Sequence, residues 1–162
     1  MIQLAKKSNP TIRLIKKEEV SKASELLARL KRLNGEFDPL LKTSDSLETE
    51  ARLALEQAME DKDTIVLVAV DQAKVVGLVK GVLRDRVFYD PKKEGAVVDF
   101  YILPEYRRHT LGKELISEAS LQLKKKGAEL ITAEFPSQNE IAKNFYDKIG
   151  FRSLTNVYAK AD

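Results

Sequence analysis

The chain has 162 residues, of which 43% are hydrophobic and 33% are charged, a balance typical of a soluble globular protein. This length suits one sizeable core, so we expect a single domain over residues 1–162. With no cysteine and one histidine, the chain excludes disulfides, thiolate catalysis, Cys-ligated zinc and a multi-histidine metal site. The net charge of +3 is too balanced to indicate nucleic-acid binding by itself.

Apolar segments are short throughout. The longest run, TIVLVAV at 64–70, is far too short to span a bilayer. The first ten residues lack the long apolar segment of a secretion signal. We therefore expect a cytoplasmic protein without a membrane partner.

The first part of the chain predicts one strand and two helices. Residues 11–15 form a short β-prone run, and apolar residues then recur at helical spacing from 17 to 34, with Gly35 as a plausible stop. A second helix is expected to begin near Asp45, because Asp45 and Glu48 have the spacing of a capping box.

The rest of the chain predicts strands around two more helices. TIVLVAV and VVGLVKGVL flank the turn DQAK and predict a hairpin, and GAVVDFYIL (95–103) predicts a central strand buried on both faces. The elements expected after it are a helix over 105–126, a strand over 128–135, a helix over 139–149 and a closing strand over 151–160. The sequence therefore predicts an α/β (α+β) fold with a mixed, mostly antiparallel sheet of six or seven strands flanked by about four helices.

The stretch YILPEYRRHTLG (101–112) gathers Arg107, Arg108 and His109 where the central strand passes into a helix. A helix N-terminus exposes unpaired N–H groups and the positive end of the helix dipole, so this loop can cradle an anion. A phosphate or pyrophosphate is the expected ligand, and an ordinary loop with solvated arginines is the alternative. The stretch contains neither a Walker loop nor a dinucleotide fingerprint.

In its context, this run resembles the acetyl-CoA-binding motif of the GNAT superfamily of N-acetyltransferases, [Q/R]-x-x-G-x-[G/A]. Arg107 fills the first position and Gly112 the last, whereas Thr110 replaces the middle glycine. A second stretch, NEIAKNFYDKIGF (139–151), is similar to the family's later motif N-x-x-A-x-x-x-Y-x-x-x-G-F. The two motifs occur in the family's order and are separated by one strand.

The resemblance implies acetyl-CoA as the cofactor and a GNAT-like sheet. It also implies a main-chain bulge at Ile102 and Leu103 that holds the pantetheine and polarises the acetyl carbonyl. The other residues expected to bind the cofactor are Arg107, Arg108, His109, Thr110, Leu111, Gly112, Lys113, Asn139 and Tyr146.

For catalysis, the resemblance implies direct attack of a bound amine on the thioester. Tyr146 is expected to protonate, or to hydrogen-bond to, the departing thiolate. Asp99 is the candidate general base, directly or through water, and its alternative role is a structural ion pair with an arginine. Glu134, at the end of the next strand, is a rival base.

The sequence thus predicts an N-acetyltransferase that moves an acetyl group from acetyl-CoA to a primary amine. The alternative is a non-catalytic acyl-CoA-binding regulatory module, suggested by Thr110. A pI near 9 would also fit nucleic-acid binding, but the scarcity of arginine–aromatic clusters argues against it. The acceptor, a small-molecule amine or a protein or peptide amine, stays open, and so does a homodimer.

Overall fold

The computed structural model of the chain describes residues 9–107 and 110–162. Its strands are β1 (Thr11–Leu14), β2 (Thr64–Asp71), β3 (Lys74–Asp85), β4 (Lys93–Ile102) and β5 (Leu130–Ala133). Its helices are α1 (Val20–Phe37), α2 (Leu47–Glu60), α3 (Leu111–Lys125) and α4 (Glu140–Lys148), with short 3₁₀ turns at Lys17–Glu19, Pro39–Leu41 and Pro104–Tyr106. None of the helices in these two ranges combines the length and apolar character that a membrane crossing requires.

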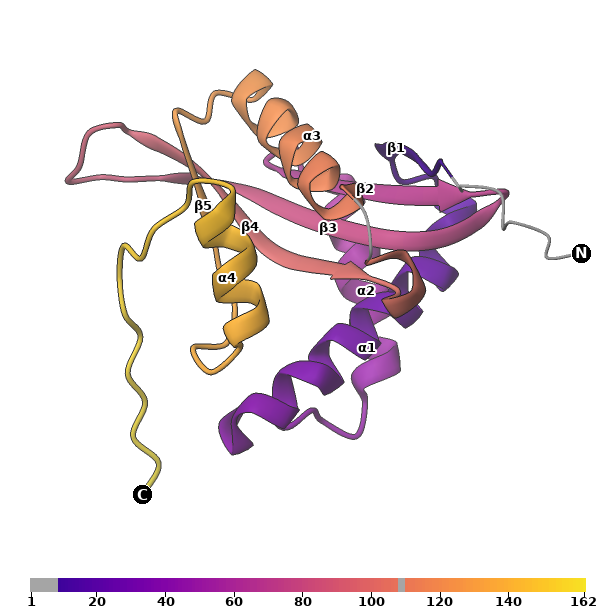
Figure 1. Cartoon of the computed structure of the whole chain (residues 1–162), viewed down its shortest axis with the longest axis horizontal. Helices are drawn as coiled ribbons and strands as arrows, with labels where there is room; N and C mark the ends of the chain where they lie inside the picture. The colour runs from indigo at the N-terminus through magenta and orange to yellow at the C-terminus, as the bar shows by residue number, and fades with distance from the viewer. Residues whose placement is uncertain (1–8, 108–109) are drawn as a thin grey trace, which may run out of the picture.

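The strands form one mixed sheet in the order β1-β2-β3-β4-β5 (Figure 1). Neighbouring strands run antiparallel except β4 and β5, which are parallel because α3 carries the chain back between them. The predicted β2–β3 hairpin is confirmed. Gln72 and Ala73 form its two-residue turn, both with positive φ, as such a turn requires.

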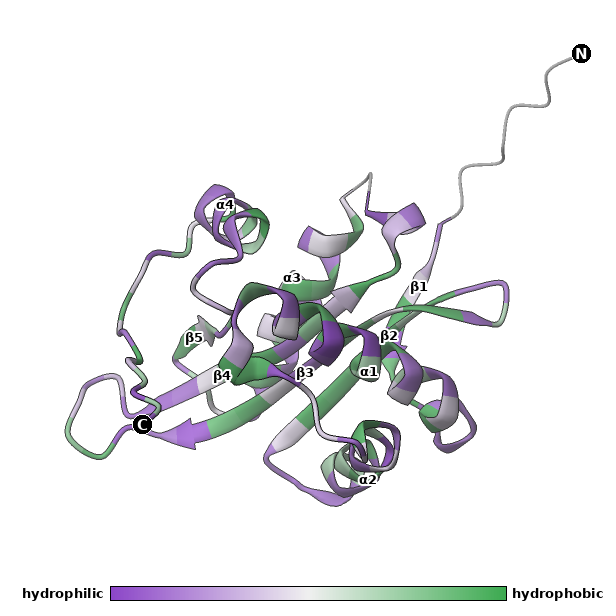
Figure 2. Ribbon diagram, turned by 90° about the horizontal axis from the view of Figure 1, so that it is seen from below, coloured by the Kyte–Doolittle hydropathy of each residue, from purple (hydrophilic) through white to green (hydrophobic). Residues whose placement is uncertain are grey.

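Helices cover both faces of the sheet. The pair α1 and α2 packs on one face, and α3 and α4 lie on the other (Figures 1 and 2). Glycines in β3 and β4 let α3 approach closely, because a Cβ at Gly81 or Gly95 would lie only 2.9 or 2.8 Å from the Leu123 side chain. The core between these layers is built from Val, Leu, Ile and Ala side chains of the central strands and the inner helix faces.

Two helix boundaries differ from the prediction. The first helix does not stop at Gly35 but runs to Phe37, and the glycine serves a close approach, since a Cβ there would lie 3.1 Å from Leu41 O. The expected capping box of the second helix is absent among the described residues, because the N-cap is Ser46 in place of Asp45, without a side-chain cap. Glu48 instead forms an ion pair with Arg32.

Two other expectations were wrong. The third helix begins at Leu111 rather than near Glu105, because Pro104 opens a separate 3₁₀ turn. The closing strand over 151–160 is not formed: within the described chain, residues 151–162 belong to no helix or strand. Among the described residues the sheet therefore has five strands instead of six or seven.

Candidate functional site

A bulge in β4 decides which side chains face which half of the molecule. Val97 lies opposite Gly81 and Asp99 opposite Lys80, so Val98 is an extra residue that reverses the alternation of side chains. Beyond this bulge Asp99 faces α1, whereas Phe100 faces α3 and α4. The prediction of a bulge at Ile102 and Leu103 was therefore wrong, because the bulge lies at Val98.

The β4–β5 ladder ends well before β4 does. Its last pair is Val97 with Ala133, followed by a bond from Glu134 N–H to Val97 O of 3.0 Å. From there to Ile102, the edge of β4 opposite β3 has no strand partner among the described residues. Main-chain polar groups therefore line the gap where β4 and β5 part (Figure 1).

The main-chain N–H groups that face the gap differ from those expected. Leu103 N–H donates to Val76 O at 2.9 Å, so it is already used within the sheet and is not available as an oxyanion donor. Because successive N–H groups of a strand point to opposite sides, those of Ile102 and Phe100 point away from β3, into the gap. The cofactor contact expected of Ile102 stays a prediction. The Leu103 N–H is corrected, because it is used within the sheet, and the N–H on the open side of β4 is that of Phe100.

Arg107 belongs to the connection between β4 and α3, and its side chain turns back to the end of β4. Its Nε donates to Ile102 O at 2.7 Å, and its guanidinium lies 5.0 Å from the centre of the Tyr101 ring. Its side chain is thereby anchored to the end of β4 beside the gap. The neighbouring Arg108 and His109, both expected to bind the cofactor, lie outside the described residues.

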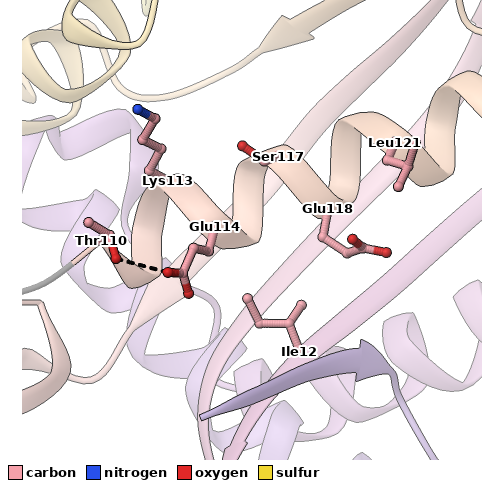
Figure 3. A pocket seen from close by; sticks show the side chains of 7 residues that line it. All are labelled: Ile12, Thr110, Lys113, Glu114, Ser117, Glu118 and Leu121. Carbon is pink, nitrogen blue, oxygen red and sulfur yellow. Dashed lines mark hydrogen bonds between the residues drawn. The ribbon is translucent and has the colours of Figure 1, made fainter. Parts of the chain in front are cut away.

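The first turn of α3 offers main-chain donors. Its first helical bond runs from Glu114 N–H to Thr110 O at 2.9 Å, which leaves the N–H groups of Leu111, Gly112 and Lys113 without a partner inside the helix. Leu111 buries its side chain in the core, whereas Lys113 is exposed. The Thr110 hydroxyl donates to Glu114 Oε1 at 2.9 Å (Figure 3), so its proton is engaged locally.

Gly112 brings this turn against an aromatic cluster. A Cβ at Gly112 would lie 3.2 Å from the Phe145 ring and 3.4 Å from the Phe100 ring. Phe100 and Phe145 stack with centroids 5.5 Å apart, and Tyr146 packs against both of them. The glycine therefore permits contact between α3, β4 and α4 at one place.

Tyr146 is the centre of this cluster. It stacks on Phe135 at 5.3 Å and meets Phe151 edge-on at 5.2 Å, and only 4% of it is exposed. Burial raises the pKa of the Tyr146 hydroxyl above its ordinary value, so the phenol stays protonated at neutral pH.

Asn139 caps the N-terminus of α4, the helix that carries Tyr146. Its Oδ1 accepts from Ala142 N–H at 3.0 Å, and its NH₂ group takes no part in this cap.

Asp99 lies on the opposite face of the sheet. It is 6% exposed and its Oδ1 lies 2.6 Å from Lys31 Nζ, on α1. The expected ion pair is therefore present, but its partner is a lysine and not an arginine. Glu134, the rival base, is exposed and pairs with Arg84 at 3.2 Å.

The sequence reasoning missed Phe100 and Lys31. A bulge at Val98 could not be read from an almost uniformly apolar strand, so Phe100 was not assigned to the site. Lys31 carried no signal either, because the register of α1 against β4 is a long-range property.

A pocket of about 580 Å³ lies elsewhere, between β1 and the outer side of α3 (Figure 3). Thr110 is at one end of it, Ile12 closes one wall, and Glu114 and Glu118 contribute two carboxylates. Lys113 adds an ammonium group, so the lining carries charges of both signs. No residue of β4 or β5 lines it, although Thr110 and Lys113 also belong to the first turn of α3.

Comparison with known families decides the identity of the chain. The model of the acetyltransferase (GNAT) family matches residues 27–151. The chain belongs to the acetyltransferase (GNAT) family. No curated protein matches this GNAT chain in sequence.

Solved structures resemble this GNAT chain over nearly its full length. A transcriptional regulator from Bacillus halodurans is 19% identical, with a TM-score of 0.75 over 95% of this chain and 100% of that one. The aminoglycoside 6'-N-acetyltransferase AAC(6')-IG from Acinetobacter haemolyticus is 18% identical, with a TM-score of 0.75 over 94% and 97%. The aminoglycoside N-acetyltransferase AAC(6')-Iy in complex with CoA is 17% identical, with a TM-score of 0.76 over 98% of both chains. At these identities the similarity establishes a common fold.

Proposed function

We propose that this chain is an acetyl-CoA-dependent N-acetyltransferase that moves an acetyl group to a primary amine by direct attack in a ternary complex. One observation carries the proposal: β4 and β5 part beside the first turn of α3, and both β4 and α3 present main-chain N–H groups there. Membership of the acetyltransferase family and the fold shared with an aminoglycoside acetyltransferase crystallised with CoA support it.

The residues present fit acetyl-CoA. The N–H groups of Leu111, Gly112 and Lys113, at the positive end of α3, suit its phosphates. The N–H groups of Ile102 and Phe100 suit the amide-bearing pantetheine arm, as an added strand would be bound. Further along, the free NH₂ group of Asn139 can donate to the same arm.

When bound, acetyl-CoA supplies a thioester whose carbonyl an amine can attack. The Tyr146 hydroxyl, kept protonated by burial, donates a hydrogen bond to the departing sulfur. Its raised pKa favours hydrogen bonding over complete transfer of its proton, because a thiol with a pKa of about 8.5 is the stronger acid. The aromatic rings around Tyr146 exclude water from this position.

Asp99 takes the proton of the attacking amine, directly or through water. Asp99 lies on the α1 face and Tyr146 on the other. The amine therefore attacks from the α1 face, and the thiol leaves on the opposite face of the sheet. The proposal requires the two substrates to meet where β4 and β5 part, beyond the last pair of the ladder. Such an arrangement allows both substrates to be bound at once, which direct attack requires.

The Lys31–Asp99 pair indicates the chemistry of the acceptor. The Lys31 side chain places a primary ammonium 2.6 Å from Asp99 Oδ1. A carboxylate that already accommodates this group suits a primary amine of a small molecule, a peptide or a protein. The acceptor would share Asp99 with Lys31 or displace it.

The test measures thiol release from acetyl-CoA with a panel containing a polyamine, a lysine peptide and an aminoglycoside. We expect release with at least one amine and a rise in melting temperature of about 5–10 °C with CoA at about 100 times its Kd. An unchanged melting temperature at saturating CoA would overturn both cofactor binding and the reaction.

A second candidate function is a non-catalytic acyl-CoA-binding regulatory module. Thr110 favours it, because a threonine replaces the flexible glycine of the motif and directs its hydroxyl to Glu114. The shared fold with a protein described as a transcriptional regulator is in line with it. It predicts the same thermal shift with CoA but no thiol release with any amine of the panel.

A further inference from the structure

Lys31 lies on the inner face of α1, where the helix packs on the sheet. Leu27 and Ala28 are buried on this face, and Lys31 follows them by four and three residues, so it continues the same stripe. Its side chain is 40% exposed, whereas the two residues before it in the stripe are almost fully buried. A primary amine therefore points toward the sheet at the place where the core meets solvent.

This amine is already in contact with the candidate general base. Lys31 Nζ lies 2.6 Å from Asp99 Oδ1, and Asp99 is the carboxylate to which the proposed function gives the proton of the acceptor. A general base must lie within hydrogen-bond distance of the group that it deprotonates. The chain itself thus holds one primary amine where the reaction requires one.

The same pair lies beside the gap between β4 and β5. The last pair of the ladder is Val97 with Ala133, so Asp99 belongs to the part of β4 whose outer edge is open among the described residues. Neighbouring strands lie about 4.8 Å apart, so a thioester bound along this edge lies about one strand spacing from Asp99. The flexible four-carbon stem of Lys31 can carry its amine over such a distance.

A second lysine near Asp99 is less well placed to react. Lys80 is paired with Asp99 in the β3–β4 ladder, so its side chain points to the same face of the sheet. It extends from β3, however, and β4 lies between β3 and the gap. Lys80 can help to compensate the charge of Asp99, whereas Lys31 can reach the reacting carbon.

We propose that Lys31 is itself an acetyl acceptor, so that the chain acetylates its own Lys31 when acetyl-CoA is bound without an amine substrate. This inference rests on the proposed function, because it uses the same donor and the same base. Lys31 gives one ammonium proton to Asp99, and its Nζ then attacks the thioester carbonyl carbon. The N–C bond forms, the C–S bond breaks, and the second amine proton leaves on the sulfur as the free thiol of CoA.

Acetylation would change both members of the ion pair. It converts the Lys31 ammonium into a neutral amide, so Asp99 loses the cation at 2.6 Å. The added acetyl group also fills the position beside Asp99 that an acceptor amine would take. The modification therefore opposes the reaction with other amines at the same carboxylate.

The first test incubates the full parent chain with acetyl-CoA and locates acetyl groups by peptide mass spectrometry over time. Lys93 is the matched reference in the same chain, because its Nζ also lies 2.6 Å from a carboxylate, that of Asp85, and its side chain is 45% exposed. It lies at the hairpin end of β4, away from the gap. We expect Lys31 to react at least about 100-fold faster than Lys93. Equal rates at the two lysines, or a preference for Lys80, would overturn the proposal.

The second test removes the carboxylates one at a time. Asp99→Asn should lower the rate of Lys31 acetylation at least about 100-fold, since an amide cannot take the proton. The matched control, Asp85→Asn, should leave that rate unchanged. A rise in melting temperature with CoA shows that each variant is folded and binds the cofactor. Unchanged labelling of Lys31 in Asp99→Asn contradicts the proposal, and the first test stands on the parent chain alone.

The third test asks whether Lys31 reacts within its own chain. Because the amine and the base lie in one chain, the rate constant should not change when the protein is diluted in saturating acetyl-CoA. A rate constant that rises in proportion to chain concentration would mean transfer between chains, which contradicts the proposal.

The same samples are assayed for thiol release with the amine panel, which separates this inference from the proposed function. Release with an amine and no acetyl group on Lys31 would overturn the inference alone. If CoA raises the melting temperature, but neither thiol release nor labelling of Lys31 occurs, the inference and the acetyltransferase function fail together.

Discussion

Lys31 Nζ lies 2.6 Å from Asp99 Oδ1, and this ion pair joins α1 to β4 just beyond the Val98 bulge. Because Asp99 is almost fully buried, its carboxylate depends on the ammonium for charge compensation. Lys31 itself is partly exposed and can move toward solvent. An acceptor amine can therefore reach Asp99 without leaving a charge isolated in the interior.

The first prediction concerns the two halves of this pair. Asp99→Asn should lower kcat/KM at least about 100-fold, since an amide cannot take the proton of the amine. Lys31→Met keeps the apolar stem and removes only the charge. It should cost about 1–2 kcal/mol of unfolding free energy, less than a fully buried pair would, and keep most of the activity. Initial rates and urea unfolding measure both effects. Full activity in Asp99→Asn would mean that the proton leaves by another route.

The second prediction concerns the hydroxyl of Tyr146. Tyr146→Phe should lower kcat about 10- to 100-fold, the value of one hydrogen bond to a charged sulfur. Its melting temperature should change little, because the ring contacts with Phe100, Phe135 and Phe145 remain.

The matched control for Tyr146 is Tyr106→Phe. The Tyr106 hydroxyl donates to Asp71 at 2.7 Å, so its loss removes a hydrogen bond of the fold. We expect lower stability and an unchanged kcat. If kcat in Tyr146→Phe equals that of the parent, the hydroxyl takes no part in the reaction.

The third prediction concerns the glycines beneath α3. A Cβ at Gly95 would lie 2.8 Å from Leu123 Cβ, which no rotamer change can move, whereas at Gly81 the nearest atom is Leu123 Cδ1 at 2.9 Å. Gly95→Ala should therefore destabilise by about 2–3 kcal/mol and Gly81→Ala by about 1 kcal/mol. Denaturant unfolding of the two variants gives the comparison, and a reversed order would refute the packing argument.

The fourth prediction concerns pH and the Arg13–Glu19 pair. Arg13 donates to both oxygens of Glu19 at 2.8 Å, and these hydrogen bonds lower the pKa of the Glu19 carboxyl. A lowered folded-state pKa stabilises the fold above the unfolded pKa of about 4.3, and the contribution is lost as pH falls through the folded value.

Glu19→Gln should therefore cost about 1 kcal/mol at neutral pH and less in acid, so that its stability curve meets the parent curve at low pH. The exposed Glu25, 3.9 Å from Lys22, supplies the control Glu25→Gln. Melting temperatures between neutral and acidic pH measure the difference. Parallel curves for parent and Glu19→Gln would rule out this linkage.

Local sequence predicted most of the fold because most elements carry their own signals. Gly127 and Gly150 both adopt positive φ just after α3 and α4, where glycine commonly ends a helix. The prediction that Gly35 ends the first helix was wrong, because a glycine needed for close packing looks the same in sequence as one that ends a helix. The strand expected over 151–160 was wrong, because a β-prone segment forms a strand only where a sheet edge pairs with it, and local sequence does not specify that edge.

For the candidate site, the sequence predicted where residues lie within one helix or strand, but not which residues of different elements meet. Asn139 and Tyr146 have the positions that the later motif implies, at the cap and in the last turns of α4. By contrast, whether Leu103 or Phe100 offers its N–H to the gap depends on one extra residue in β4. Which N–H groups of a strand face its neighbour depends on how the two strands pair, so it cannot be predicted from the sequence of one strand.

Val98 makes the two faces of the sheet chemically unlike. Without this extra residue the strand would alternate strictly, with Asp99 still opposite Lys80 and Phe100 still opposite Val79. If the bulge were flattened and Val98 kept in the ladder, every later side chain of the strand would exchange sides. The carboxylate of Asp99 would then lie among the aromatic rings, and the ring of Phe100 would lie opposite the Lys31 ammonium. The polarity of the strand's far half therefore depends on one irregular pairing and not on its composition.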